Sequence, residues 1–313
     1  MRNLIKIKGD ASSRKFFRKK GKNSSSIVIY AKNEKFKNLL VYDAINKIFI
    51  KNKILAPNLY KENYSKNYIE IQDFGNETVY KYLRKLRKNK FNSFKKIINL
   101  LFQIQKIKNR KIKNFKNKNY TIPKYEKKIL IDEANLFCDW YARKKLSNLE
   151  QNRFSKKYKN IIKKLALNLK QKNDIFVHRD FHVSNLMFVN NHIGIIDSQD
   201  ALIGNKAYDL ASLIDDVRLK TSESLKNKIY NFYLGKNKKL KAYEFKNDFE
   251  ILSVLRNLKI IGIFSRLAIR DKKKKYLKMI PYTWELINMR INQNAIFQDL
   301  KNLLNKYFKK KII

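Results

Sequence analysis

The strongest signal in this chain is the sequence His-Arg-Asp-Phe-His-Val-Ser-Asn at positions 178–185, followed by Ile-Ile-Asp at 195–197. Phosphoryl transfer from ATP needs a carboxylate near the attacking hydroxyl and oxygen ligands for the Mg²⁺ that bridges the phosphates. The spacing His-Arg-Asp-x-x-x-x-Asn is that of a kinase catalytic loop. We therefore predict that Asp180 is the catalytic carboxylate and that Asn185 and Asp197 are the magnesium ligands.

The segments around this loop are predicted to be short strands. Ile175–Val177 precedes the loop, and Leu186–Val189 and His192–Ile196 follow it. The dipeptide Asn190-Asn191 suits a tight hairpin turn, because asparagine tolerates positive φ. Such a hairpin is short enough to bring Asn185 and Asp197 together.

The remaining pattern predicts strands early and helices later. Ser26–Ala31 and Tyr68–Gln72 read as strands, Phe36–Lys51 reads as a helix, and Asp73-Phe74-Gly75 ends the second strand. Later segments with apolar residues at helical spacing are Glu77–Leu86, Ser93–Lys106, Tyr125–Lys145, Phe154–Lys170 and the chain from Tyr208 onward. With only 7 Gly and 3 Pro, the composition favours a helix-rich fold. We predict an α+β, two-lobed protein with a small N-lobe over residues 1–75, a hinge at Gln72–Asn76 and a larger, mainly helical C-lobe over 76–313.

The charge balance is strongly basic, with 72 Lys plus Arg against 26 Asp plus Glu and a formal net charge of +46. A field of this sign attracts polyanions such as nucleic acid. Because the basic residues are spread along the whole chain, we interpret them mainly as solvated surface lysines and expect no specific nucleic-acid partner.

The chain has one cysteine, Cys138, so it can form no internal disulfide, and its apolar surroundings indicate a core residue. No stretch reaches the roughly 18 apolar residues that span a bilayer, and Met1–Gly9 lacks the apolar run of a signal peptide. We expect a soluble cytoplasmic protein without membrane contact. The sequence does not indicate its oligomeric state.

The residues around Asp180, Asn185 and Asp197 resemble the aminoglycoside phosphotransferase and choline kinase group, whose fold is protein-kinase-like. Further stretches that carry the resemblance are 9–18 (Gly-Asp-Ala-Ser-Ser-Arg-Lys-Phe-Phe-Arg), 69–75 (Ile-Glu-Ile-Gln-Asp-Phe-Gly), 196–201 (Ile-Asp-Ser-Gln-Asp-Ala), 208–213 (Tyr-Asp-Leu-Ala-Ser-Leu) and 256–267 (Arg-Asn-Leu-Lys-Ile-Ile-Gly-Ile-Phe-Ser-Arg-Leu). Together they are similar to the bacterial N-acetylmuramate/N-acetylglucosamine kinase branch, which phosphorylates the anomeric hydroxyl of amino sugars recovered from peptidoglycan.

The resemblance implies roles for residues outside the central motif. A loop with Gly9, Ala11, Ser12 and Ser13 would cover the ATP phosphates with backbone N–H groups, and main-chain groups of Ile71, Gln72 and Asp73 would hold the adenine. His178, Arg179 and Asp209 would be structural, with Asp209 accepting hydrogen bonds from the catalytic-loop backbone. His182 is expected to brace the loop, with contact to substrate or metal as the alternative.

The phosphate-binding lysine departs from the kinase pattern. The slot at the end of the strand that would carry it holds Tyr30. Lys32 lies two residues on and is our candidate, with simple solvation as the alternative; Glu34 is the nearest acidic partner.

Candidate acceptor residues come from three places. Gln199 and Asp200 follow the metal carboxylate directly. Glu133 and Trp140 lie on one helical segment and could take a sugar by hydrogen bonds and stacking, although aromatics at helical spacing are more often core residues. Arg266, four residues before Arg270, could receive a lactyl carboxylate or could be a surface charge.

We predict an ATP- and Mg²⁺-dependent kinase that phosphorylates the anomeric hydroxyl of an amino sugar. The alternatives are kinase activity on another acceptor, such as choline, homoserine or an aminoglycoside, and a basic nucleic-acid-associated pseudokinase. An aminoglycoside is polycationic and calls for an acidic pocket, and the acid-poor composition counts against it. Fold alone does not choose the acceptor.

Overall fold

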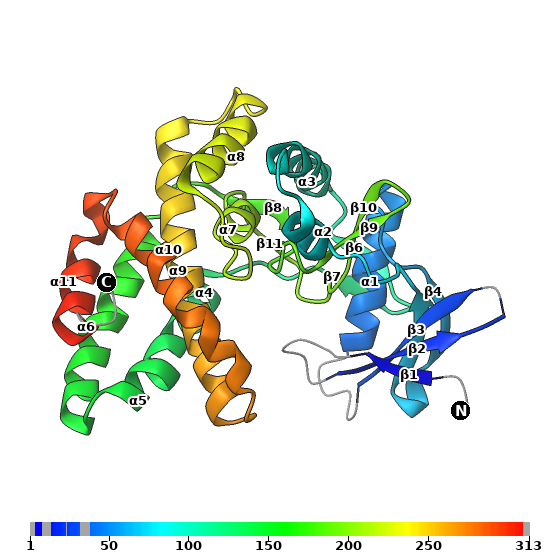
Figure 1. Ribbon diagram of the computed structural model, residues 1–313, viewed down its shortest axis with the longest axis horizontal. Coiled ribbons are helices and arrows are strands. Elements are labelled where there is room, and N and C mark those ends of the chain that lie inside the picture. The colour runs from blue at the N-terminus through cyan, green and yellow to red at the C-terminus, as the bar shows by residue number, and fades with distance from the viewer. Residues whose placement is uncertain (1–3, 8–13, 23, 32–37, 309–313) are drawn as a thin grey trace. The chain divides into compact units, whose positions relative to one another are not determined.

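The computed structural model describes residues 4–7, 14–22, 24–31 and 38–308 (Figure 1). The chain divides into two compact units, one of residues 1–123 with 175–203 and one of 124–174 with 204–313. The first is rich in strands and the second is built almost wholly from helices, so the predicted combination of a β-rich N-terminal part and a helical C-terminal part is confirmed.

The first unit is organised around a five-stranded antiparallel sheet in the order β1-β2-β3-β5-β4. Its strands are β1 (Leu4–Ile7), β2 (Lys15–Lys20), β3 (Ser25–Tyr30), β4 (Leu59–Asn63) and β5 (Tyr68–Gln72). Helix α1 (Asn38–Lys51) has the predicted apolar face, and its residues Leu39 and Tyr42 form one core with Ile29, Ile69 and Ile71 of the sheet. The alternate residues 69 and 71 share a strand face, which explains why one side of β5 is apolar.

Helices and small hairpins complete this unit. Their bounds are α2 (Val79–Lys85), α3 (Lys90–Gln105), β6 (Lys111–Lys113), β7 (Asn119–Thr121), β9 (Leu186–Val189) and β10 (His192–Ile195); β8 (Asn173–Val177) pairs with β11 (Leu202–Asn205), and the division between the units passes through both. The start of α2 is bonded to the segment after β8: the Tyr80 N–H donates to the Val183 carbonyl at 2.9 Å, and Thr78 forms an antiparallel β-bridge with Met187. Residues well beyond 75 belong to the same compact unit as the sheet. The predicted lobe boundary at residue 75 stays a prediction.

The second unit packs its helices around α9 (Ala242–Ile269), a 28-residue helix with α10 alongside it (Figure 1). The other elements are α4 (Lys127–Leu136), a π-helical segment η2 (Phe137–Ala142), α5 (Arg143–Lys145), α6 (Asn148–Leu167), α7 (Tyr208–Ile214), α8 (Glu223–Gly235), α10 (Ile280–Ile291) and α11 (Gln298–Phe308). Phe137 lies at the centre of an aromatic core, with ring contacts to Tyr158, Trp284 and Phe308. Cys138 is buried beside it as predicted, and burial raises the pKa of its thiol to about 12.

One helix predicted over Tyr125–Lys145 is interrupted by η2, at the point where α9 approaches most closely. A Cβ on Gly262 would lie 2.3 Å from the Leu136 carbonyl carbon and 2.7 Å from the Phe137 nitrogen. The contact is backbone to backbone, so neither side can move a side chain away.

We expect Gly262→Ala to destabilise the protein by more than about 3 kcal/mol, because overpacking against a fixed backbone forces the helices apart. The free energy of unfolding in urea measures the effect. Gly235→Ala is the matched control: a Cβ there has nothing within 4 Å, so its stability should stay equal to wild type or rise slightly. Equal stability of the two variants would contradict the close α9 contact.

Candidate active site

The loop after β8 is folded back on Asp180 by main-chain and amide bonds. The Asp180 carbonyl accepts the N–H of His182 at 3.0 Å and the side-chain amide of Asn185 at 3.1 Å. The Asn185 N–H in turn donates to the His182 carbonyl at 2.9 Å. The Asn185 side chain makes its bond to Asp180 through the amide nitrogen, so its amide oxygen takes no part in this bond.

The hairpin predicted at Asn190-Asn191 is present, with φ values of 46° and 64° at the two turn residues. Its pairing sets Ile195 opposite Leu186, and just beyond it the Ile196 N–H donates to the Asn185 carbonyl at 3.0 Å. Asn185 and the residue before Asp197 are thus joined directly. The hairpin therefore brings the two predicted metal ligands into neighbouring backbone positions.

His178 lies fully buried under this loop. Its ring stacks on Phe49 at 6.2 Å between centroids and meets Phe181 edge-on. Burial lowers the pKa of its imidazole, and the carboxylates of Asp180 and Asp197 oppose that shift only in part. A neutral, packed His178 agrees with the structural role predicted for it. His182 is also buried, and its main-chain bond to Asn185 favours bracing over metal binding.

Asp197 is held in an uncommon conformation at the end of the hairpin. Its φ is +62°, in the left-handed region that non-glycine residues rarely adopt, and Arg179 has a φ of +72°. The next residue anchors the turn, since the buried Ser198 hydroxyl donates to Asn46 Oδ1 of α1 at 2.6 Å. Strain of this kind persists where surrounding bonds fix the backbone, and it concentrates at functional sites.

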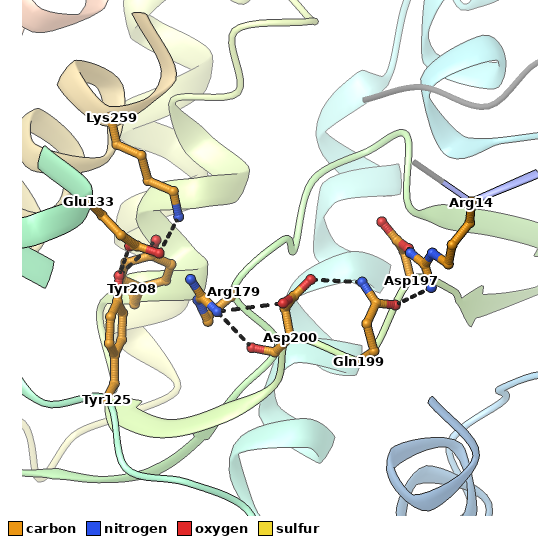
Figure 2. Close-up of polar contacts among 9 residues, drawn as sticks. All are labelled: Arg14, Tyr125, Glu133, Arg179, Asp197, Gln199, Asp200, Tyr208 and Lys259. Atoms are coloured by element: carbon orange, nitrogen blue, oxygen red, sulfur yellow. Dashed lines mark hydrogen bonds and ion pairs between the residues drawn. The ribbon is translucent and has the colours of Figure 1, made fainter. Parts of the chain in front are cut away.

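A chain of polar contacts runs from Asp197 to Arg179 (Figure 2). The Arg14 guanidinium lies 2.6 Å from Asp197 Oδ1 and donates to Gln199 Oε1 at 3.0 Å. Gln199 donates to Asp200 Oδ2 at 2.7 Å, and Arg179 lies 3.8 Å from the Asp200 carboxylate. The two predicted acceptor residues that follow Asp197 are therefore part of one network with it.

The hinge segment has its side chains engaged in structural bonds. Arg18 donates to the Asp73 carboxylate through Nε at 2.5 Å and Nη2 at 3.0 Å, and Ser25 and the Gly75 N–H also donate to it. Burial alone would raise the pKa of Asp73, but these donors outweigh it and lower the pKa. The Gln72 N–H already donates to the Asn58 carbonyl at 2.8 Å. Adenine binding by main-chain groups of residues 71–73 stays a prediction.

The remaining nucleotide-binding candidates fall outside the part of the chain that the structure describes. They are Gly9, Ala11, Ser12, Ser13 and Lys32, together with Glu34. Their predicted roles stay predictions.

Glu133, in the second unit, lies in a polar cluster of its own (Figure 2). Its carboxylate is 2.9 Å from the Lys259 ammonium and accepts the Tyr125 hydroxyl, and both ionic side chains are 14% exposed. Tyr125 also contacts Tyr208 edge-on at 5.1 Å. Lys259 therefore balances the charge of Glu133.

The other candidates in that unit have distinct surroundings. Trp140 is half-buried in η2 and Arg266 is half-buried on α9, whereas Arg270 is exposed and pairs with Asp271 at 2.7 Å. Asp209 is buried in the first turn of α7. Its predicted bonds to the catalytic-loop backbone stay a prediction.

Two residues of the first unit were missed by the sequence analysis. Arg14 directly follows the predicted phosphate loop, but among 72 Lys and Arg it had no distinguishing signal. Asn46 lies on the buried face of α1, where a polar residue between Ile45 and Ile48 was the available signal.

The donor set at Asn185 and Asp197 fits Mg²⁺, which prefers oxygen ligands and retains several waters. Asn185 presents its amide oxygen, since the nitrogen is bonded to Asp180, and the Asp197 side chain is 35% exposed. Within the described ranges, no group of three or more His, Cys, Asp and Glu side chains could hold a metal. Two protein ligands are typical of a site that shares its ion with substrate phosphates.

In the part of the chain that the structure describes, none of the helices combines the length and hydropathy needed to cross a bilayer.

Comparison with known proteins identifies the class of protein to which this chain belongs. The model of the phosphotransferase enzyme family matches residues 4–243. A Plasmodium vivax ethanolamine kinase superposes with a TM-score of 0.63 at 15% identity, over 90% of this chain and 81% of that one. An aminoglycoside phosphotransferase with bound ADP superposes with a TM-score of 0.58 at 16% identity, over 91% of both chains. The fold is that of the protein-kinase-like phosphotransferases.

The chain belongs to the phosphotransferase enzyme family and is an ATP-dependent kinase. Among its relatives, an N-acetylmuramate/N-acetylglucosamine kinase of Neisseria meningitidis serogroup B is 28% identical over 87% of this chain and 80% of its own length. A protein of the same name from Pseudomonas aeruginosa is 26% identical over 96% of this chain and 87% of its own length.

Proposed function

We propose that this kinase transfers the γ-phosphoryl group of ATP, with Mg²⁺, to the anomeric hydroxyl of N-acetylmuramate or N-acetylglucosamine. The observation that carries the kinase mechanism is the bond from Ile196 N–H to the Asn185 carbonyl, which joins Asn185 to the residue before Asp197, close to Asp180. The names of the relatives support the acceptor class.

Asp180 is the group we assign to the acceptor hydroxyl. Its carbonyl accepts bonds from His182 and Asn185, which fix the backbone at this position. A carboxylate held in this way orients the hydroxyl and accepts its proton as the oxygen attacks the phosphorus.

Asn185 and Asp197 are the residues we assign to the metal. The Asn185 amide oxygen and the Asp197 carboxylate would hold one Mg²⁺ together with phosphate oxygens. When bound, the ion neutralises charge that develops on the phosphates during transfer. The nucleotide itself would lie under the loop of Gly9 to Ser13 and against the main chain of residues 71–73.

Five residues are proposed to recognise the acceptor. Gln199 and Asp200 follow the metal carboxylate and would meet the reacting end of the sugar. Glu133 would accept sugar hydroxyls while Lys259 balances its charge, a role that their partial exposure supports. Trp140 would stack on the sugar ring, and Arg266 would bind the lactyl carboxylate of N-acetylmuramate. With these substrates the enzyme would act in the cytoplasm, in the reuse of peptidoglycan sugars.

The test is ATP consumption by purified protein with Mg²⁺ and one acceptor at a time: N-acetylmuramate, N-acetylglucosamine, choline, homoserine or kanamycin. We expect turnover with the amino sugars alone, a product with phosphate on the anomeric carbon by NMR, and no turnover for Asp197→Ala. The Arg266→Gln variant should lose affinity for N-acetylmuramate and keep that for N-acetylglucosamine, since the second sugar has no carboxylate.

The alternatives give different outcomes. Turnover with choline, homoserine or kanamycin would keep the mechanism and reject the amino sugars as acceptors. Nucleotide binding without turnover on any acceptor would reject all five, and full activity of Asp197→Ala would reject the assigned metal site.

A further inference from the structure

Arg14 is a buried cation whose partner is the carboxylate assigned to the metal. Its side chain is 8% exposed, one guanidinium nitrogen lies 2.6 Å from Asp197 Oδ1, and the other donates to Gln199 at 3.0 Å (Figure 2). The guanidinium also lies over the Phe16 ring, 5.6 Å from its centroid. Asp197, at 35% exposed, is open to solvent on its other side.

The neighbouring cations of β2 are used differently. Arg18 forms an ion pair with Asp73 at 2.5 Å, and Lys19 forms one with Glu70 at 3.1 Å. Both ion pairs link β2 to β5 or to the residue that follows β5. Arg14 alone of these three reaches the predicted site of phosphoryl transfer. It also stands at the end of the loop that we assign to the ATP phosphates.

A divalent cation bound to the open side of the Asp197 carboxylate would lie close to the Arg14 guanidinium that contacts Oδ1. A magnesium ligand oxygen lies about 2.1 Å from the ion, which leaves the guanidinium facing a divalent cation at short range. The repulsion is relieved when an anion lies between the two cations. Nucleotide phosphates supply that anion, and the planar guanidinium fork matches their oxygens.

We propose that Arg14 is a phosphate-binding residue for the nucleotide: it exchanges its contact with Asp197 for one with a phosphate oxygen when the magnesium nucleotide binds. This inference rests on the proposed role of Asp197 as a metal ligand. Arg14 holds the Asp197 carboxylate directly and also binds Gln199, which donates to Asp200. After the exchange it contributes a positive charge to the transferred group. No covalent bond changes in this exchange.

Two opposite effects of removing the guanidinium follow. Without its competitor, Asp197 binds a bare divalent cation more tightly in the nucleotide-free enzyme. Without its phosphate contact, the enzyme binds a magnesium nucleotide more weakly. A merely structural arginine would not move the two affinities in opposite directions.

The experiment compares Arg14→Met with wild type in two binding measurements. Binding of Mn²⁺ to nucleotide-free protein is measured by electron paramagnetic resonance. Binding of the Mg²⁺ complex of AMP-PNP, a non-hydrolysable ATP analogue, is measured by calorimetry. AMP, which lacks the outer phosphates, is titrated in the same way. We expect Mn²⁺ affinity to rise several-fold, AMP-PNP affinity to fall about 10- to 100-fold, and AMP affinity to stay within about 3-fold. Lys19→Met removes one charge from β2, the strand that directly follows Arg14, and should change none of the three affinities.

Arg14→Lys keeps the positive charge and removes the planar guanidinium group. It is the variant to measure if Arg14→Met does not fold. It should weaken AMP-PNP binding by less than Arg14→Met. An AMP-PNP affinity equal to that of Lys19→Met in a folded Arg14 variant would overturn the phosphate role, and an unchanged Mn²⁺ affinity of Arg14→Met would overturn the exchange at Asp197. If either of these results is found and Asp197→Ala has lost turnover, the proposed function stands and only the role of Arg14 is rejected. If Asp197→Ala is active, the metal site on which the inference rests is rejected as well.

Discussion

Asp180→Asn is expected to lower kcat for phosphoryl transfer by about 10²–10⁴-fold, the range that a positioned acid–base residue contributes. The substitution keeps the size of the side chain and removes its charge and basicity. The loop should keep its shape, because it is the Asp180 carbonyl that accepts the bonds from His182 and Asn185. Nucleotide affinity should therefore stay within a few-fold of wild type.

Steady-state kinetics with the preferred acceptor and calorimetric titration with the AMP-PNP complex measure the two quantities. Asp299→Asn, an exposed carboxylate on α11, is the matched control and should retain full kcat. If Asp180→Asn keeps more than about a tenth of the wild-type kcat, Asp180 is not the acid–base group. A parallel loss of nucleotide affinity would instead indicate a damaged loop.

The parts of the fold that the sequence predicted are those where local chemistry dictates the conformation. β5 and β9 have the predicted bounds because each is a short apolar run that ends at a turn, and the Asn190-Asn191 hairpin follows from the tolerance of asparagine for positive φ. Strand β2, Lys-Phe-Phe-Arg-Lys-Lys, was not predicted because its charged residues hide the alternation. The interruption at η2 lies against Gly262 of a helix far away in the sequence, a contact that local periodicity does not report.

The candidate site divides in the same way. Asp180, Asn185 and Asp197 were predictable because the chemistry fixes their spacing within one loop and one hairpin. Arg14 comes from 183 positions away, and a cation has no sequence signal in a chain with net charge +46. The pairing of Glu133 with Lys259 likewise joins two helices, so only the structure reveals that this carboxylate is neutralised.

A buried ion network, absent from the sequence analysis, ties four helices of the second unit together. Asp215, at the end of α7, accepts from Arg290 of α10 at 2.9 and 3.1 Å and from Ser253 of α9 at 2.5 Å. Lys226 of α8 lies 3.2 Å from the same carboxylate and donates to the Ile214 carbonyl. All three ionic side chains are 7% exposed or less. Removing the carboxylate therefore leaves two cations buried beside each other.

We expect Asp215→Asn to cost about 3–5 kcal/mol of folding free energy, the range for breaking a buried ion pair by removing one partner. Burial alone would raise the pKa of Asp215, but Arg290 and Lys226 outweigh it and hold the pKa below its ordinary value. A lowered folded-state pKa gives stability that is present above the unfolded pKa of about 3.9 and is lost as pH falls through the folded value. The stability gap between wild type and Asp215→Asn, measured by urea unfolding, should thus be constant near neutral pH and should shrink below about pH 4. Asp299→Asn, which removes an exposed carboxylate, should change stability little at any pH. A gap for Asp215→Asn that does not narrow in acid would mean that its charge is not the source of the stability.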